Sequence, residues 1–262
     1  MTFDLWQTLI FDEPDDEQVR GRMRCEGMQS VFSSLGLAIP LDDLLEAHEK
    51  SARQLQALWS RNECISTVDQ IRLIAQLAST NTIDIARDPR AVERLQKAYI
   101  DPLFVFPPIL REDALDTLAG TRQRARKIGL ISNTGRSPGI ALRRVLDKLG
   151  ILRFFDAIVF SDEAGCRKPD KRIFDLALRE LGSQPSDTVH VGDNPEADVW
   201  GAKQAGMRAV LLDYPVPEEL KREPGSLFAL SRSDGHVSDS EIKADARIAS
   251  LREVLDFIDS LV

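Results

Sequence analysis

Short apolar runs alternate with helix-length segments through the second half of the chain. The runs 128–132, 157–161, 188–191 and 208–212 are rich in apolar and β-branched residues, and each follows a segment whose apolar residues recur at helical spacing. Parallel strands need a long crossover connection, usually a helix, so this alternation predicts a parallel sheet with helices on both faces. We therefore expect an α/β fold with a doubly wound parallel sheet. The helices expected before and between these strands span 112–126, 138–149, 171–181 and 197–205.

Between a short apolar run at the N-terminus and the first of these strands, the apolar spacing is helical and no strand is predicted. A capping-box pair, Thr67 and Gln70, predicts the start of one of the helices. Another helix ends at a glycine after a face made of Met28, Val31, Phe32 and Leu35. We therefore expect a core domain of residues 1–12 and 109–262, interrupted by an inserted helical domain of residues 13–108.

The C-terminal part is less regular. Residues 215–243 are polar and rich in Gly, Pro, Ser and charge, which predicts a long surface loop. A short edge strand over 246–249 and an amphipathic helix over 251–261 are expected to follow it.

Bulk composition excludes several classes of protein. The 262 residues suit one large α/β domain with an insertion, and the net charge of −8, without a basic block, argues against a general nucleic-acid binder. The three cysteines form no CxxC pair, so neither a disulfide framework nor a zinc site is expected. No signal peptide is apparent and no apolar run approaches membrane-spanning length, so we expect a reduced, cytoplasmic protein without a membrane partner. Only three residues precede Asp4, which makes the first strand very short unless the natural start lies upstream.

Chemically capable residues follow the predicted strands in a fixed order. Asp4 ends the first apolar run, and Ser132 and Asn133 end the run that begins at residue 128. Lys168 lies in the segment Arg167-Lys168-Pro169-Asp170, and Gly192-Asp193 follows another strand, with Asp198 five residues after Asp193. Taken alone, each fits a turn or helix cap. Asp4 is expected to face a crevice at the end of its strand, and the ordered set is a much stronger signal than any of its members.

This ordered set resembles the haloacid dehalogenase (HAD) superfamily, whose members mostly transfer phosphoryl groups through an aspartate. The resemblance covers roughly the expected core and implies a HAD-like Rossmannoid fold with a C1-type helical cap. It implies that Asp4 attacks the substrate, with Ser132 and Lys168 as further catalytic residues. Thr8, Ser132, Asn133 and Lys168 are then expected to bind the phosphoryl group of a small phosphorylated metabolite. The expected Mg²⁺ ligands are Asp4, the backbone carbonyl of Trp6, Asp193 and, directly or through water, Asp198.

Trp6 departs from the pattern of the family's phosphatases, which carry a second Asp at this position. That Asp protonates the leaving oxygen, a contribution typically of about two to four orders of magnitude in rate. Dehalogenases carry an aromatic residue there and need no metal, whereas Gly192-Asp193 favours the metal-dependent branch. The leading hypothesis is thus a Mg²⁺-dependent phosphatase that forms an aspartyl-phosphate. The alternatives are a metal-independent haloacid dehalogenase-type hydrolase and a catalytically weak member that binds a phospho-ligand; the oligomeric state stays open.

The remaining polar candidates are predicted to be structural. His190 lies on a buried strand and is expected to be a satisfied core residue, and His48 is expected to pack on an apolar helix face. Arg20, Arg22 and Arg24 are interpreted as a solvated helix face.

Overall fold

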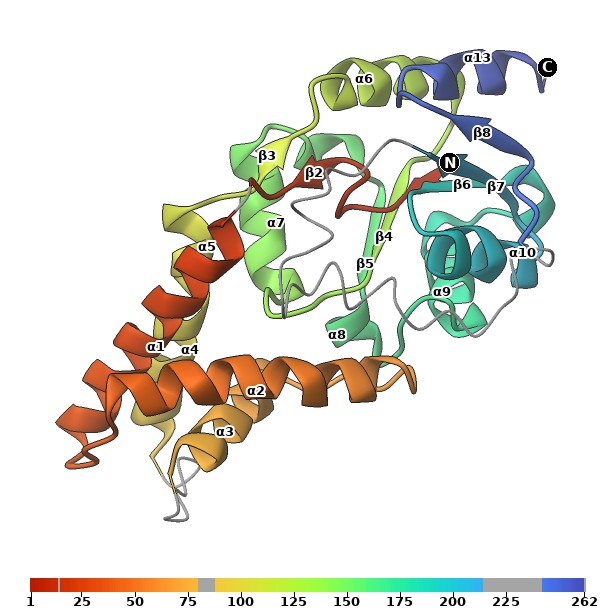
Figure 1. The fold of residues 1–262 in the computed structure, drawn as a ribbon. Helices are drawn as coiled ribbons and strands as arrows, with labels where there is room; N and C mark the ends of the chain where they lie inside the picture. Colours follow the sequence, from red (N-terminus) through yellow and green to blue (C-terminus); the bar gives the residue numbers. More distant parts are fainter. Residues whose placement is uncertain (14, 80–87, 214–241, 262) are drawn as a thin grey trace.

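Residues 1–13, 15–79, 88–213 and 242–261 are described by a computed structural model (Figure 1). Six strands form one parallel sheet in the order β5-β4-β1-β6-β7-β8. β1 lies in the middle of the sheet, between β4 and β6. From β1 the later strands follow outwards in both directions, β4 and β5 on one side and β6, β7 and β8 on the other, so the strand order reverses at β1. The strands are β1 (Thr2–Phe3), β4 (Gly129–Ser132), β5 (Ala157–Phe160), β6 (Val189–Gly192), β7 (Arg208–Leu212) and β8 (Ala246–Ile248).

Helices cover both faces of this sheet, as the alternating pattern predicts. Successive residues of β4 show why: Leu130 belongs to an apolar cluster with residues of the helices 114–124, 139–148 and 253–259, whereas Ile131 belongs to a second cluster with residues of the helices 171–181 and 201–204. The predicted α/β fold with a doubly wound parallel sheet is therefore confirmed. The helical elements of this part are α6 (Ala114–Arg124), α7 (Gly139–Lys148), α8 (Ser161–Ala164), α9 (Lys171–Leu181), the π-helix η4 (Pro195–Trp200), α10 (Gly201–Gln204) and α13 (Glu253–Asp259), with short 3₁₀ turns η2 (Leu152–Phe154) and η3 (Pro185–Asp187).

A block of helices projects from the sheet on one side of the molecule (Figure 1). It has an apolar cluster of its own, which includes Met28, Phe32, Ile74 and Leu95. Two short antiparallel strands, β2 (Ile10–Phe11) and β3 (Ile109–Leu110), pair where the chain leaves the core and returns to it. The helices of the block are α1 (Asp16–Ser34), α2 (Leu41–Trp59), α3 (Thr67–Ala78), α4 (Pro89–Ile100) and α5 (Pro102–Val105).

Two local predictions are wrong in detail, both because a side chain nearer the N-terminus caps the helix. Ser66 Oγ accepts a hydrogen bond from the Asp69 backbone N–H (3.1 Å), so the cap of α3 lies one residue before the predicted Thr67. Asn194 Oδ1 accepts from the backbone N–H groups of Glu196 and Ala197, so helical structure begins at Pro195, earlier than residue 197, and its first part is a π-helix.

The predicted edge strand and final helix are confirmed as β8 and α13, although both are shorter than expected. The predicted surface loop over 215–243 lies almost wholly outside the described residues. Within the part of the chain that the structure describes, no helix combines the length and apolar character needed to cross a bilayer.

Candidate active site

Asp4 lies at the carboxyl end of β1, in the middle of the sheet. Its backbone N–H donates to the carbonyl of Val191 on β6 (2.8 Å), and its side chain is 8 % exposed. The chain then turns sharply, because the N–H groups of Leu9 and Ile10 both donate to the carbonyl of Leu5. Gln7 adopts a left-handed conformation (φ 62°) within this turn. The Asp4 carboxylate is thereby held at the point where the strand order reverses, the usual place for a ligand site in such sheets.

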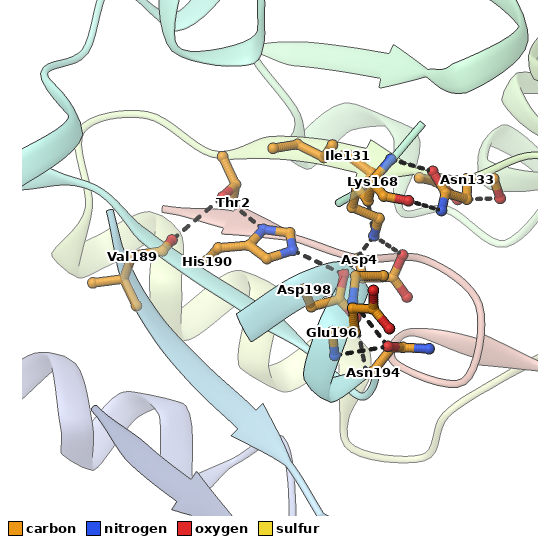
Figure 2. A network of polar contacts seen from close by, with 12 residues as sticks. Thr2, Asp4, Ile131, Asn133, Lys168, Val189, His190, Asn194, Glu196 and Asp198 are labelled. Carbon is orange, nitrogen blue, oxygen red and sulfur yellow. Dashed lines mark hydrogen bonds and ion pairs between the residues drawn. The ribbon is translucent and has the colours of Figure 1, made fainter. Parts of the chain in front are cut away.

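Lys168 joins the predicted site residues to one another. Its Nζ donates to the carboxylates of Asp4 and Asp198 (2.6 Å to Asp198 Oδ1) and to the Ile131 carbonyl (2.8 Å), as Figure 2 shows. These three bonds use all three hydrogens of the ammonium group. The lysine is therefore a fixed buried cation that brings together residues lying far apart in the sequence.

Asp198 is held by three partners. Oδ1 accepts from Lys168 and lies 3.1 Å from His190 Nε2, while Oδ2 accepts from the Asn194 N–H (2.9 Å). The contact between this carboxylate and β6 requires a glycine, since a Cβ on Gly192 would lie 2.2 Å from Asp198 Cγ. The orientation of Asp198 thus explains the glycine of the Gly192-Asp193 pair.

His190 supports Asp198 from the buried strand β6. A carboxylate can only accept, so Nε2 carries the hydrogen and Nδ1 accepts from the Thr2 hydroxyl (2.9 Å). Burial lowers the pKa of His190, which keeps the ring neutral. The prediction of a satisfied core histidine is confirmed.

The acidic residues form a compact cluster. Asp4, Asp193 and Asp198 each offer an oxygen, and these oxygens lie within 4.8 Å of one another. Burial raises the pKa of Asp4 to about 7; Lys168 opposes the rise, whereas Asp198 and Asp193 add to it. Burial acts in the same direction on Asp198, but Lys168 and His190 outweigh it and hold the pKa of Asp198 below its usual range. The site therefore holds three carboxylates around one ammonium ion.

Ser132 and Asn133, which are both expected to bind the phosphoryl group, have different hydrogen-bond partners. Ser132 ends β4 with its hydroxyl buried, donating a long bond to the Asn133 carbonyl (3.3 Å). The Asn133 side chain instead makes a reciprocal pair with the Lys168 backbone: Nδ2 donates to its carbonyl (2.9 Å) and Oδ1 accepts from its N–H (2.8 Å). In this arrangement the Asn133 side chain fixes the Lys168 loop.

Thr8 and Trp6 belong to the turn after Asp4. The Thr8 hydroxyl is fully buried and has no hydrogen-bond partner among the described residues. Its carbonyl accepts from Arg111 Nε (2.9 Å), which holds the turn in place. The Trp6 side chain is half-buried and packs against the apolar cluster around Phe3.

Two of the three arginines interpreted as a solvated face are buried, so that interpretation is wrong for Arg20 and Arg24. Both side chains are 1 % exposed and form ion pairs, Arg20 with Asp12 and Arg24 with Glu17. Arg22 is exposed, as predicted. A signal was present in the sequence, because positions 20, 24 and 28 are spaced by four and so share the apolar face of the helix.

No pattern in the sequence marks Arg136 as a residue near the site. It follows the Ser132-Asn133 segment, is 4 % exposed, and contacts helices α2 and α4. His48, on α2, packs as predicted, with its ring against Gly21; burial lowers its pKa, with Arg136 and Arg24 adding to the effect. Nothing in local spacing distinguishes a buried arginine at position 136 from a surface one.

Comparisons with known proteins agree with this geometry. A family model described as haloacid dehalogenase-like hydrolase matches residues 1–206. A glyceraldehyde 3-phosphate phosphatase of Methanothermobacter thermautotrophicus is 40% identical over 104 residues, 39% of this chain and 44% of that protein, which is less than two thirds of its length. A phosphoserine phosphatase of Thermus thermophilus is 28% identical over 97% of this chain and 96% of its own length.

The fold is also that of a solved 2-haloacid dehalogenase from Pseudomonas syringae pv. Tomato DC3000, with a TM-score of 0.62 and 19% identity over 100% of this chain and 98% of that one. At this identity the likeness concerns the fold alone. Since the family model matches most of the chain and the site residues follow the strands in the family's order, the protein belongs to the haloacid dehalogenase-like hydrolases.

Proposed function

We propose that the protein is a Mg²⁺-dependent phosphatase of a small phosphorylated metabolite, with Asp4 as nucleophile. The observation that carries the proposal is the cluster in which Lys168 contacts both Asp4 and Asp198, while Asp193 brings a third carboxylate within 4.8 Å. Phosphoryl transfer needs this combination of an attacking oxygen, a fixed cation and oxygen ligands for a metal. The names of the relatives from Methanothermobacter and Thermus support the same class of substrate.

In the proposed reaction an Asp4 carboxylate oxygen attacks phosphorus, and the bond from phosphorus to the leaving oxygen breaks with its electron pair on that oxygen, which takes up a proton from water. The product is an aspartyl-phosphate, which water then hydrolyses to free Asp4 and inorganic phosphate. Lys168 Nζ, already bonded to Asp4, neutralises negative charge on the transferred group. The buried Ser132 and Thr8 hydroxyls are the proposed donors to the phosphoryl oxygens.

The residues fit a hard divalent cation. Three buried carboxylates lie within 4.8 Å of one another, and all the atoms that they offer are oxygens, which hard divalent cations prefer. Asp4 and Asp193 would hold Mg²⁺ directly with the Trp6 carbonyl. Asp198 would act through water, because its two oxygens already accept from Lys168, His190 and Asn194. Bound there, Mg²⁺ would supply charge neutralisation on the phosphoryl oxygens.

The helical block is proposed to be the C1-type cap, residues 13–108, over a core of residues 1–12 and 109–262. Its contacts with the loop after β4 place it next to the carboxyl end of the sheet (Figure 1). A cap in this position excludes water from the site and selects the substrate by its non-reacting part.

Trp6 is the observation that favours a second candidate, a metal-independent dehalogenase. A halide leaves without a proton, so a site without a general acid next to Asp4 suits attack on a carbon–halogen bond. The cluster of Asp4, Asp193 and Asp198 argues against it, since attack of the Asp4 oxygen on carbon requires no further carboxylates beside the nucleophile.

A hydrolysis screen tests the proposal. Purified protein is incubated with a panel of phosphorylated metabolites and an aryl phosphate, each with Mg²⁺ or with EDTA, and with Asp4→Asn as the control. We expect phosphate release that needs both Mg²⁺ and Asp4. Release of chloride from a 2-chlorocarboxylic acid in EDTA, without any phosphate release, would replace the proposal by the second candidate.

A further inference from the structure

The loop that follows β4 reaches into the helical block through Arg136. Arg136 Nη1 donates to the Tyr99 hydroxyl on α4 (3.1 Å). Its Nη2 donates to the His48 carbonyl (2.9 Å) and the Ser51 hydroxyl (3.0 Å), both on α2. With 4 % of its surface exposed, this guanidinium depends on protein partners rather than water.

A second contact joins the same loop to α3. Gln70 Nε2 donates to the Gly135 carbonyl (3.0 Å), and Gln70 Oε1 accepts from the Tyr99 hydroxyl (2.9 Å). Tyr99 therefore connects both contacts, since its oxygen also accepts from Arg136. Three helices of the block hold one loop of the core.

The other side of this loop faces the catalytic residues. Asn133 makes its reciprocal hydrogen bonds to the backbone of Lys168, whose Nζ contacts Asp4 (Figure 2). Thr134, between Asn133 and Gly135, accepts at its carbonyl from Arg167 (2.6 Å), the residue before Lys168. Hydrogen bonds thus tie one end of the loop to the helices of the block and the other end to Arg167 and Lys168, and the backbone of residues 133–136 connects the two.

We propose that Arg136 is a positioning residue, which ties the loop of residues 132–136 to the cap helices and, through Asn133, places Lys168 against Asp4. The proposal rests on the proposed function and adds to it that the cap acts on the reacting end of the site. Arg136 touches none of the three carboxylates in the contacts described, so its effect on the reaction passes through the loop.

Kinetics with a small aryl phosphate and Mg²⁺ test this, because such a substrate makes little demand on cap specificity. Arg136→Gln should lower kcat by about tenfold or more with a smaller change in KM, since a loop shift of an ångström costs that much in rate. Arg136→Lys, which keeps a cation within reach of the same acceptors, should recover part of the loss. Tyr99→Phe should lower kcat less, and adding it to Arg136→Gln should have little further effect, because both remove one network.

Hydrogen exchange provides a readout that needs no turnover. In Arg136→Gln, the amides of residues 133–136 and 166–168 should exchange faster than in the wild type, while those of β7 should not change. Faster exchange at both loops would support the linkage even if the wild type hydrolysed none of the phosphates tested, a result that would count against the proposed function instead.

Arg124→Gln is the matched control. Arg124 pairs with Asp259 at the surface, away from the cap, so its loss should alter neither kcat nor exchange at these loops. A folded Arg136→Gln with kcat within twofold of the wild type would overturn the proposal. So would a large fall in kcat with unchanged exchange, which would indicate direct contact of Arg136 with substrate. If Arg136→Gln does not fold, Tyr99→Phe decides by the same two criteria.

Discussion

Two groups of charged side chains are buried in this protein, one in the core and one at the base of the helical block. The core group, here the carboxylate cluster, consists of Asp4, Asp193 and Asp198 around Lys168. The other, here the arginine cluster, pairs Arg20 and Arg24 with Asp12 and Glu17. The first brings three acidic side chains together with one lysine, whereas the second pairs two acidic side chains with two arginines.

We interpret this difference in composition as separating a structural cluster from the proposed catalytic one. Burial alone would raise the pKa of Glu17, but Arg24 and Arg20 outweigh it and the pKa lies below its usual value. Burial raises the pKa of Asp12 to about 6 and that of Asp4 to about 7, in each case against one opposing cation. Two neighbouring carboxylates add to the rise in both cases, Asp198 and Asp193 for Asp4 and Glu17 and Asp16 for Asp12, so the pKa of a single carboxyl does not distinguish the two clusters. What distinguishes them is the ratio of acidic to basic side chains, and the cluster with more acids than bases is the one proposed to bind a divalent cation.

Asp4→Asn is expected to have the largest effect. It removes the nucleophile and one proposed metal ligand, so kcat/KM for an aryl phosphate should fall by about four orders of magnitude or more. Thermal unfolding should show that the variant is folded. Asp116→Asn, a change of the same kind at an exposed position on α6, should leave the rate unchanged. Near-wild-type turnover by a folded Asp4→Asn would break the comparison, because the carboxylate cluster would then have no covalent role.

Trp6→Asp should have the next largest effect, which is a change in the ratio of kcat/KM for an alkyl phosphate to kcat/KM for an aryl phosphate. An alkyl phosphate needs a proton on its leaving oxygen, whereas an aryl phosphate does not. Supplying an acid should therefore raise the alkyl-to-aryl ratio of kcat/KM, by up to the two to four orders of magnitude or so that general acids contribute.

Trp6→Asn is the control for this change, since it matches the size of Asp but cannot donate a proton at the required pKa. An unchanged ratio in a folded Trp6→Asp variant that still responds to Mg²⁺ would mean that the proton already comes from the cap or from the substrate.

The strands were predictable because they depend on local patterns, and parallel strands with buried faces are apolar runs. That Asp4, Lys168 and Asp198 belong to one site was implied by the resemblance, which depends on the order of short motifs along the chain rather than on contacts between them. The burial of His190 was also predictable, because this residue lies within the apolar run of a predicted strand.

Arg136 and Gln70 were not predictable in this way. Both are polar residues whose burial depends on a contact between the core and the helical block, and such a contact has no period in the sequence. Gln70 was even assigned to a helix cap, although its side chain bonds to Gly135 and Tyr99. Arg24 is an intermediate case. Its burial was predictable from its place on the apolar face of the helix, but the interpretation of Arg20, Arg22 and Arg24 as a solvated face gave that spacing no weight.

Asp193→Asn tests whether the carboxylate cluster holds a metal. Losing one charged ligand should weaken Mg²⁺ by about tenfold to a hundredfold, seen as a higher Mg²⁺ concentration for half-maximal rate. Excess Mg²⁺ should restore part of the rate, which distinguishes a ligand from a residue that only supports the fold. A rate that is insensitive both to EDTA and to this substitution would favour the metal-independent dehalogenase reading.

The smallest expected effect concerns the arginine cluster and is tested by comparing two arginines of α1. Arg24→Met leaves Glu17 with fewer cations in a mostly buried position and removes the bond from Arg24 Nε to the Tyr99 carbonyl (3.2 Å). Because the Glu17 side chain keeps 27 % of its surface exposed, we discount the full cost of breaking a buried pair and expect a loss of about 2 kcal/mol in the free energy of unfolding.

Arg22→Met, two residues away, breaks only the exposed pair with Glu26 and should cost less than about 0.5 kcal/mol. Urea unfolding of both variants gives the difference directly. Equal stabilities would mean that the arginine cluster is not structural, and a balance of buried charge would then no longer separate the two clusters.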